Sequence, residues 1–172
     1  MINYYQYIPN FLNKKELKES IQDFKNLPDS SMDKEMLALG PNVYAIYNYP
    51  IFLELLCKKI NVVSKLVGEP LLPTYSCARK YRKNSLLPIH IDRPSCEISL
   101  TVNLYNDKDW PINFIVGDNV MIFNILPGDA LIYLGTQLPH WRELYTGEEY
   151  AQVFFHYVKS RGNNRRFYFD RN

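Results

Sequence analysis

A histidine and an aspartate stand two positions apart in a stretch that has the character of a β-strand. They are His90 and Asp92, with Ile91 between them. Because alternate residues of a strand point to the same face, the two side chains would project together. An imidazole and a carboxylate are two of the three ligands of the 2-His-1-carboxylate triad, which leaves positions open on a non-haem Fe(II) ion. The pair therefore predicts a metal site if a second histidine joins it.

The chain has two further histidines, and their sequence contexts differ. His140 follows a turn, a strand-like run and a second turn in "PGDALIYLGTQLPHWRE". A jelly roll pairs late strands with early ones, so it could bring His140 beside His90 and Asp92. His156 lies within "VFFHYV", and we expect it to face outward as an exposed or capped side chain. The alternate residues of that strand are expected to face inward: Ala151, Val153, Phe155 and Tyr157.

Two amphipathic helices are expected in the first part of the chain. Asn13 can cap a helix over about residues 14–26, with Glu16 three positions later to complete a capping box. A second apolar stripe predicts a helix over about residues 50–67, which Gly68 can end in a left-handed cap. We expect both helices to pack outside a β core.

Short strand-like runs separated by turn signals fill the chain from about residue 73 to 158. Before them, residues 29–41 have the composition of a loop, and "NVYAIYNY" could form a short strand. Many short strands at close spacing favour a sandwich or barrel. We therefore expect a mainly β, jelly-roll fold in a single domain spanning residues 1–172. The expected runs are "TYSCARKY", "LPIHID", "EISLTVNLY", "WPINFIV", "VMIFNI", "ALIYLG", "LPHWRELY" and "YAQVFFHYV".

Composition narrows the class of protein. The chain has 172 residues and a formal net charge of +2, so the whole chain gives no electrostatic argument for a nucleic-acid or membrane partner. Three widely spaced cysteines without a CxxC motif argue against a disulfide framework or a cysteine zinc site. The N-terminus lacks a signal-peptide pattern, and the longest apolar stretch, residues 51–67, is interrupted by charges. These features favour a soluble cytoplasmic protein, and they leave its oligomeric state open.

The C-terminus carries a cluster of basic residues opposed by Asp170 alone. A solvated tail is the ordinary interpretation of such a cluster, and a contact with a polyanion is the alternative. The cluster consists of Lys159, Arg161, Arg165, Arg166 and Arg171.

Taken together, the sequence resembles the Fe(II)- and 2-oxoglutarate-dependent dioxygenases, particularly the small prolyl-4-hydroxylase-like branch of bacteria and phages. The resemblance implies a double-stranded β-helix core that holds iron through His90, Asp92 and His140. The stretches that carry it are "IPNFLNKKEL", "LVGEPLLPTYSCARKYRKNSLLPIHIDRPSCEIS", "WPI", "PGDALIYLG", "PHWRE" and "QVFFHYV".

The resemblance also implies a reaction. Oxidative decarboxylation of 2-oxoglutarate by O2 would be coupled to hydroxylation of an unactivated C–H bond, such as one in a prolyl or other amino-acid side chain. The partner would be a small molecule or a peptide, and the sequence does not choose between them. A nucleic-acid substrate is disfavoured, because the paired arginines typical of nucleic-acid demethylases are missing.

One feature departs from the pattern of these enzymes. They carry an Arg or Lys about ten residues after the distal histidine, which binds the far carboxylate of 2-oxoglutarate, whereas this chain has Glu148, Glu149 and Tyr150 there. An anion entering a partly dry pocket still needs a cation or several hydrogen bonds. Strand phase offers four replacements, in order of preference Arg142, Tyr81, Arg79 and Asn103. If Glu97 also faces inward, Arg79 or Arg142 could pair with it.

Two other functions remain open on the sequence alone. The missing basic residue would suit a jelly-roll protein that binds metal without turnover. The same three ligands would also suit an iron oxygenase that does not use 2-oxoglutarate.

Overall fold

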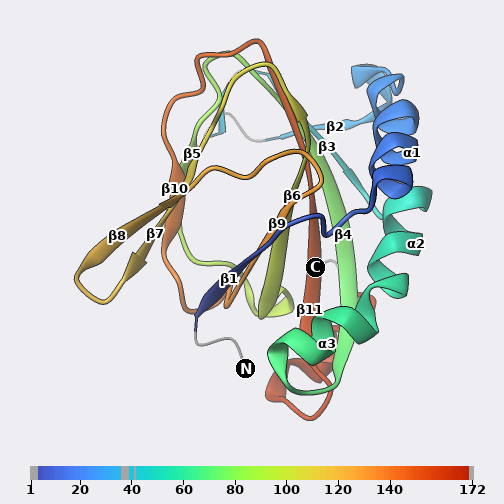
Figure 1. The fold of residues 1–172 in the computed structure, drawn as a ribbon, viewed down its shortest axis with the longest axis vertical. Coiled ribbons are helices and arrows are strands. Elements are labelled where there is room, and N and C mark those ends of the chain that lie inside the picture. The colour runs from blue at the N-terminus through green and yellow to red at the C-terminus, as the bar shows by residue number, and fades with distance from the viewer. Residues whose placement is uncertain (1–3, 36–38, 41, 171–172) are drawn as a thin grey trace.

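Two antiparallel sheets form the body of the molecule (Figure 1). The computed structural model describes residues 4–35, 39–40 and 42–170. Within those residues, the larger sheet has the strand order β1-β9-β6-β11-β4-β3-β2, and the smaller has the order β5-β10-β7-β8. The strands of the larger sheet are β1 (Tyr5–Ile8), β2 (Asp33–Lys34), β3 (Val43–Tyr47), β4 (Leu71–Arg82), β6 (Ile98–Asn106), β9 (Ala130–Tyr133) and β11 (Glu149–Lys159). Those of the smaller are β5 (Leu87–His90), β7 (Ile112–Val116), β8 (Asn119–Phe123) and β10 (His140–Arg142).

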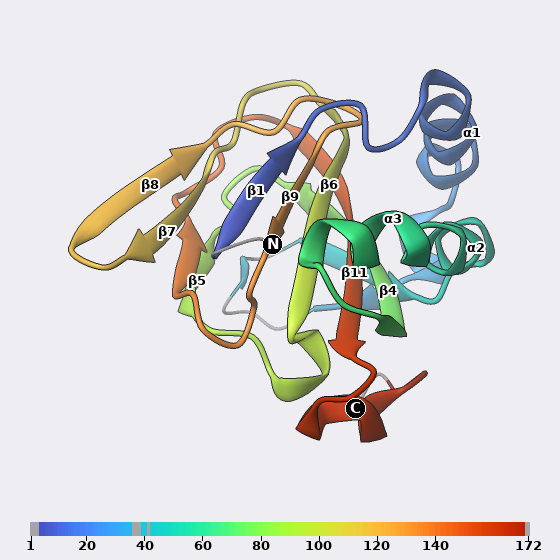
Figure 2. The same ribbon diagram turned by 60° about the horizontal axis from the view of Figure 1, so that its bottom comes forward.

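Three helices cover the outer face of the larger sheet, as Figures 1 and 2 show. They are α1 (Lys14–Lys25), α2 (Pro50–Lys58) and α3 (Ile60–Val67). Short 3-10 turns lie at Asp29–Ser31, Pro94–Cys96 and Asn163–Phe167. No described helix is long and apolar enough to cross a membrane.

Strand β11 is buried on both faces, which decides where its side chains point. One face packs under the helices with Ala151, Val153, Phe155 and Tyr157, the residues expected to face inward. The other face, which carries His156, turns toward the space between the sheets, and His156 is only 6% exposed. The expectation that His156 faces solvent is therefore wrong. Alternation predicts which residues share a face, but it cannot show that the second face is also covered.

The helix predictions hold with one exception. The capping box of α1 is present, with Asn13 accepting from the backbone of Glu16 and the Glu16 side chain accepting from the backbone of Asn13. Gly68 ends α3 in the left-handed region, with φ 87°. The helix expected over residues 50–67 is broken at Lys59, where ψ is −5° instead of the helical value near −42°. Lys59 donates to the Phe11 carbonyl and to Glu16, and these contacts lie at the break.

Two strands lie where none was expected. β1 pairs with β9 at one edge of the larger sheet, and β2 pairs with β3 at the other, inside the segment expected to be loop. β1 depends on a partner strand that is distant in sequence, and β2 has only two residues. No local sequence pattern therefore indicates either strand. In the basic cluster, Lys159 pairs with Glu69 at 3.0 Å, and Arg171 lies outside the described residues.

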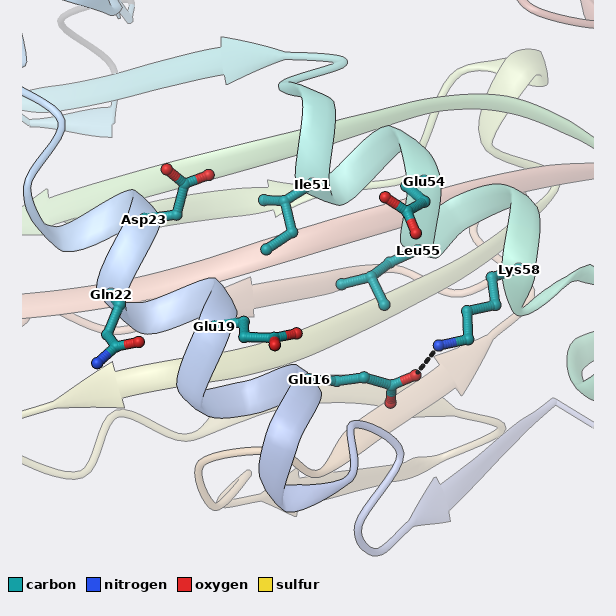
Figure 3. A pocket seen from close by; sticks show the side chains of 8 residues that line it. All are labelled: Glu16, Glu19, Gln22, Asp23, Ile51, Glu54, Leu55 and Lys58. Carbon is teal, nitrogen blue, oxygen red and sulfur yellow. Dashed lines mark ion pairs between the residues drawn. The ribbon is translucent and has the colours of Figure 1, made fainter.

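A buried carboxylate joins α1 to α2. Glu16 is 7% exposed, and one of its oxygens lies 3.0 Å from Lys58 Nζ (Figure 3). Its other oxygen lies 2.7 Å from Lys59 Nζ. Burial alone would raise the pKa of Glu16, but hydrogen bonds from Lys59, Lys58 and the Asn13 backbone lower it from 4.5 to about 2. The folded protein therefore favours the ionised carboxylate more than the unfolded chain does.

We expect Glu16→Gln to lower the free energy of unfolding near neutral pH by about 2 kcal/mol. Because the folded pKa lies below the unfolded one, this stabilisation is complete above about pH 4.5 and is lost as the pH falls toward about 2. Urea unfolding of both proteins across this range should show the difference shrinking as the pH falls. Glu19→Gln, an exposed glutamate of the same helix α1, is the control and should change little (Figure 3). A difference independent of pH would contradict the explanation.

Candidate metal centre

Three ligand atoms converge at the end of strand β5. The register of β5 and β10 places His90 opposite His140, and Asp92 follows two residues after His90. Asp92 Oδ1 lies 3.6 Å from His90 Nε2 and 3.6 Å from His140 Nε2. The three residues expected from the sequence are therefore brought together, with their ligand atoms within 4.8 Å of one another.

The two imidazoles are held in the same tautomer. His90 Nδ1 lies 2.8 Å from the Pro88 carbonyl, and His140 Nδ1 lies 2.9 Å from the Leu138 carbonyl. A carbonyl oxygen only accepts, so each Nδ1 carries a proton and each Nε2 points at Asp92, to which a neutral ring presents a lone pair and a protonated ring an N–H. Facing lone pairs and a carboxylate need a proton or a cation between them. This donor set fits a divalent metal whose histidine ligands are fixed by their second nitrogen.

The environment keeps the carboxylate charged and the His140 ring in place. Burial works to raise the pKa of Asp92, but the His90 and Ser99 contacts and the nearby histidines lower it to about 2. His140 is 2% exposed, and burial lowers its pKa. Its ring stacks on Phe114 and meets the edge of Tyr133. An ionised carboxylate beside a neutral, immobile imidazole is the state in which both can bind a metal.

Asp92 is packed tightly on its other side. Its second oxygen, Oδ2, accepts from Ser99 Oγ at 2.8 Å, and its backbone N–H donates to the Gly135 carbonyl at 2.9 Å. A Cβ on Gly135 would overlap Asp92 Oδ2 and the Cys96 carbonyl, and it would lie 2.7 Å from Ser99 Oγ. Glycine at position 135 therefore lets the carboxylate reach its place.

We expect Gly135→Ala to weaken metal binding at least tenfold, because the new methyl group must displace Asp92 or Ser99. Calorimetric titration with Ni(II) would measure this. Gly117→Ala is the control: it lies in the turn between β7 and β8 with open space around it and φ 59°, so it should cost stability alone. Equal metal affinity in the Gly135 variant would contradict the prediction.

A chain of polar side chains crosses the space between the sheets. Arg79 Nη1 and Gln152 Nε2 both reach the Tyr81 hydroxyl, at 3.4 and 3.3 Å. Arg142 Nη2 donates to Gln152 Oε1 at 3.0 Å, and Nη1 donates to the Trp110 carbonyl. Arg142 is 2% exposed, so its guanidinium lies inside the protein.

These interior residues keep unused hydrogen-bonding capacity. Within the described chain, the Nε atoms of Arg79 and Arg142 and Asn103 Oδ1 have no hydrogen-bond partner, although all three are buried. Arg79 lies 3.5 Å from Glu35, the one carboxylate paired with either guanidinium among the described residues. Arg142 is therefore a buried guanidinium that pairs with no carboxylate among the described residues, which suits an anionic ligand.

A cavity of about 380 Å³ opens on the triad. Arg79 is in its wall, whereas Arg142, Tyr81 and Asn103 are not. Asn103 instead donates to the Ile125 carbonyl and to Asn106. The wall also includes Glu35, Tyr47, Tyr75, Cys77, Arg93, Cys96, Tyr133, Phe154 and His156.

No protein-family model matches the chain, and no curated protein matches its sequence. Solved structures do match. A prolyl-4-hydroxylase from Pseudomonas putida aligns with a TM-score of 0.75 at 12% identity, over 93% of this chain and 95% of that one. An oxidoreductase of the 2OG-Fe(II) oxygenase family from Burkholderia pseudomallei gives 0.75 at 17% identity, over 94% and 88%. HygX from Streptomyces hygroscopicus, with nickel and 2-oxoglutarate bound, gives 0.72 at 14% identity, over 91% and 83%.

The chain has the fold of the 2-oxoglutarate- and iron-dependent oxygenases. The expected double-stranded β-helix with flanking helices is confirmed. Within this oxygenase fold, the candidate triad is supplied by β5, the turn after it, and β10 of the smaller sheet.

Position 150, where related enzymes were expected to carry a basic residue, has a guanidinium beside it. Tyr150 stands ten residues after His140 and is buried. The guanidinium carbon of Arg142 lies 5.0 Å from the centre of its ring and 4.9 Å from that of Trp110. A cation from β10 thus reaches the neighbourhood of a position on β11 that carries no charge itself.

Two sequence expectations about this interior need correction. Glu97 does not face Arg79 or Arg142; it precedes β6, and its carboxylate accepts from the Lys159 backbone at 3.2 Å. Ser99, two residues later on β6, does face inward and contacts Asp92. His156 was expected to be exposed and without a role in the site, yet it lies in the cavity wall beside Ser99. A strand apolar on one face and mixed on the other was the signal that could have found it.

Proposed function

We propose that this protein is a non-haem iron dioxygenase that couples oxidative decarboxylation of 2-oxoglutarate to hydroxylation of an unactivated C–H bond. The observation that carries the proposal is the convergence of His90 Nε2, His140 Nε2 and Asp92 Oδ1 in the wall of one cavity. Three protein ligands would leave the metal open positions for 2-oxoglutarate and O2. When bound, the iron would supply the oxidation chemistry that no side chain can perform.

The chain's own residues would bind and orient the Fe(II) ion and 2-oxoglutarate. His90, His140 and Asp92 would hold Fe(II), with Nδ1 of each histidine anchored to a backbone carbonyl. Arg142 is our first choice for the far carboxylate of 2-oxoglutarate, supported by its place beside Tyr150. Tyr81 and Arg79 complete the polar surface around that anion, and Asn103 is a weaker candidate because its amide is already engaged.

Two structural matches were solved with small molecules that suggest a class of substrate. HygX has been solved with hygromycin B, and another structural match, SnoN, with nogalamycin RO. We propose a small molecule or an amino-acid side chain of a peptide, which would enter beside the aromatic part of the cavity wall formed by Tyr47, Tyr75 and Phe154.

Succinate release tests the proposal directly. The purified protein, incubated with Fe(II), O2, ascorbate and 2-oxoglutarate, should form succinate at a rate that chelation of the metal abolishes. Metal binding without 2-oxoglutarate binding or turnover would favour a silent jelly-roll protein. Oxygen consumption without 2-oxoglutarate would favour an iron oxygenase of another type.

A further inference from the structure

His156 is a buried histidine that the proposed metal site does not use as a ligand. Its Nδ1 lies 2.9 Å from Ser99 Oγ, and Ser99 Oγ lies 2.8 Å from Asp92 Oδ2. Its ring stacks on Phe154 with an interplanar angle of 10° and packs against Tyr75 at 4.6 Å. The ring therefore has one orientation, in which it contacts the residue that contacts the ligand.

The direction of both hydrogen bonds follows from counting protons. Ser99 has a single hydroxyl proton, and two acceptors lie within reach: Asp92 Oδ2 at 2.8 Å and the Cys96 carbonyl at 3.1 Å. The ionised carboxylate is the nearer and the stronger acceptor, so the proton goes to Asp92. Ser99 Oγ can then only accept from His156, which must carry its proton on Nδ1. Burial keeps the His156 ring neutral by lowering its pKa to about 4, so one N–H is available for this purpose.

This relay gives the two oxygens of Asp92 different partners. Oδ2 is held by Ser99, while Oδ1 faces both Nε2 atoms of the triad. Without the N–H that His156 donates to Ser99 Oγ, Ser99 could rotate its hydroxyl to the Cys96 carbonyl, and Asp92 could turn about its terminal bond. One ligand atom each of Asp92, Cys96 and His156 also lies within 4.8 Å of the others. Ser99 Oγ bonds to both Asp92 and His156, however, which makes this arrangement a hydrogen-bond relay.

We propose that His156 is a positioning residue that, through Ser99, fixes which oxygen of Asp92 binds the metal. The proposal rests on the proposed function, because it assumes that the triad holds a divalent ion. It assigns a role to the Nδ1 atom specifically, which makes it testable by two isosteric changes. The side-chain amide of asparagine places its nitrogen near the position of histidine Nδ1, whereas that of glutamine places it near Nε2.

The test compares four proteins: wild type, Ser99→Ala, His156→Asn and His156→Gln. Each is titrated with Co(II), without 2-oxoglutarate, and the visible Co(II) spectrum is recorded. Thermal unfolding of the metal-free proteins shows that each one folds. We expect Ser99→Ala and His156→Gln to weaken Co(II) binding by about ten- to one-hundredfold and to shift the spectrum. His156→Asn should bind within about threefold of wild type, because its amide can still donate to Ser99.

The outcomes separate this inference from the function on which it rests. If the wild-type protein binds no Co(II), the proposed function and this inference both fail. If wild type binds and all three variants bind equally well, the inference alone is overturned. If His156→Asn and His156→Gln lose the same affinity, the role assigned to Nδ1 is overturned, because only the size or packing of the ring would then matter.

Discussion

Replacing Asp92 with alanine is expected to remove metal binding and turnover together. The carboxylate is the one anionic member of the triad, and both Nε2 atoms face its Oδ1. Removing a contact behind a metal ligand already costs about ten- to one-hundredfold in affinity, so loss of the ligand itself should exceed that range. Anaerobic addition of Fe(II) and 2-oxoglutarate should give a visible charge-transfer band in the wild-type protein and none in Asp92→Ala. The expectation for His90→Ala is the same.

A matched control separates loss of the site from loss of charge. Asp118 is an exposed aspartate in the turn between β7 and β8, so Asp118→Ala changes the net charge by the same amount away from the cavity. It should keep the band and the succinate rate. A band that survives in Asp92→Ala would contradict the assigned ligand set, and a wild-type protein with no band would contradict the enzymatic function.

Replacing Arg142 with alanine is expected to raise the KM for 2-oxoglutarate at least tenfold. A charge-assisted pair in a partly buried site contributes about 2 kcal/mol or more, and a tenfold change corresponds to about 1.4 kcal/mol. Arg142 is buried against Trp110, Tyr150 and Gln152, so the alanine variant should also unfold at a lower temperature. Succinate formation is therefore measured well below that temperature, as a function of 2-oxoglutarate concentration.

Two further variants test whether the effect on KM comes from the Arg142 cation itself. Arg142→Lys retains the cation and should raise KM less than Arg142→Ala does. Arg165→Ala removes an exposed arginine from the C-terminal cluster and should leave KM unchanged. If KM for 2-oxoglutarate does not change in Arg142→Ala, the role moves to Arg79, whose side chain lines the cavity, or to Asn103.

Local patterns predicted most of the elements around the site. The capping box at Asn13, the left-handed Gly68 and the short strands after residue 70 depend on interactions within a few residues, which the sequence records directly. The helix break at Lys59 could not be predicted in this way. It coincides with contacts to Phe11 and Glu16, more than forty residues earlier in the chain.

The sequence by itself identified the three members of the candidate triad, two from their spacing and His140 from its context and the family resemblance. Strand alternation also predicted that Arg142 turns inward with His140. Asp92 was expected on the same strand as His90, whereas β5 ends at His90 and Asp92 follows it. Only the tertiary structure decided what surrounds them. It covered both faces of β11 and thereby brought His156 to Ser99, and it placed the Arg142 guanidinium beside Tyr150. The physical reason is that strand alternation fixes which side chains point together. Pairing and layer packing between distant segments fix what they point toward, and no local pattern records these.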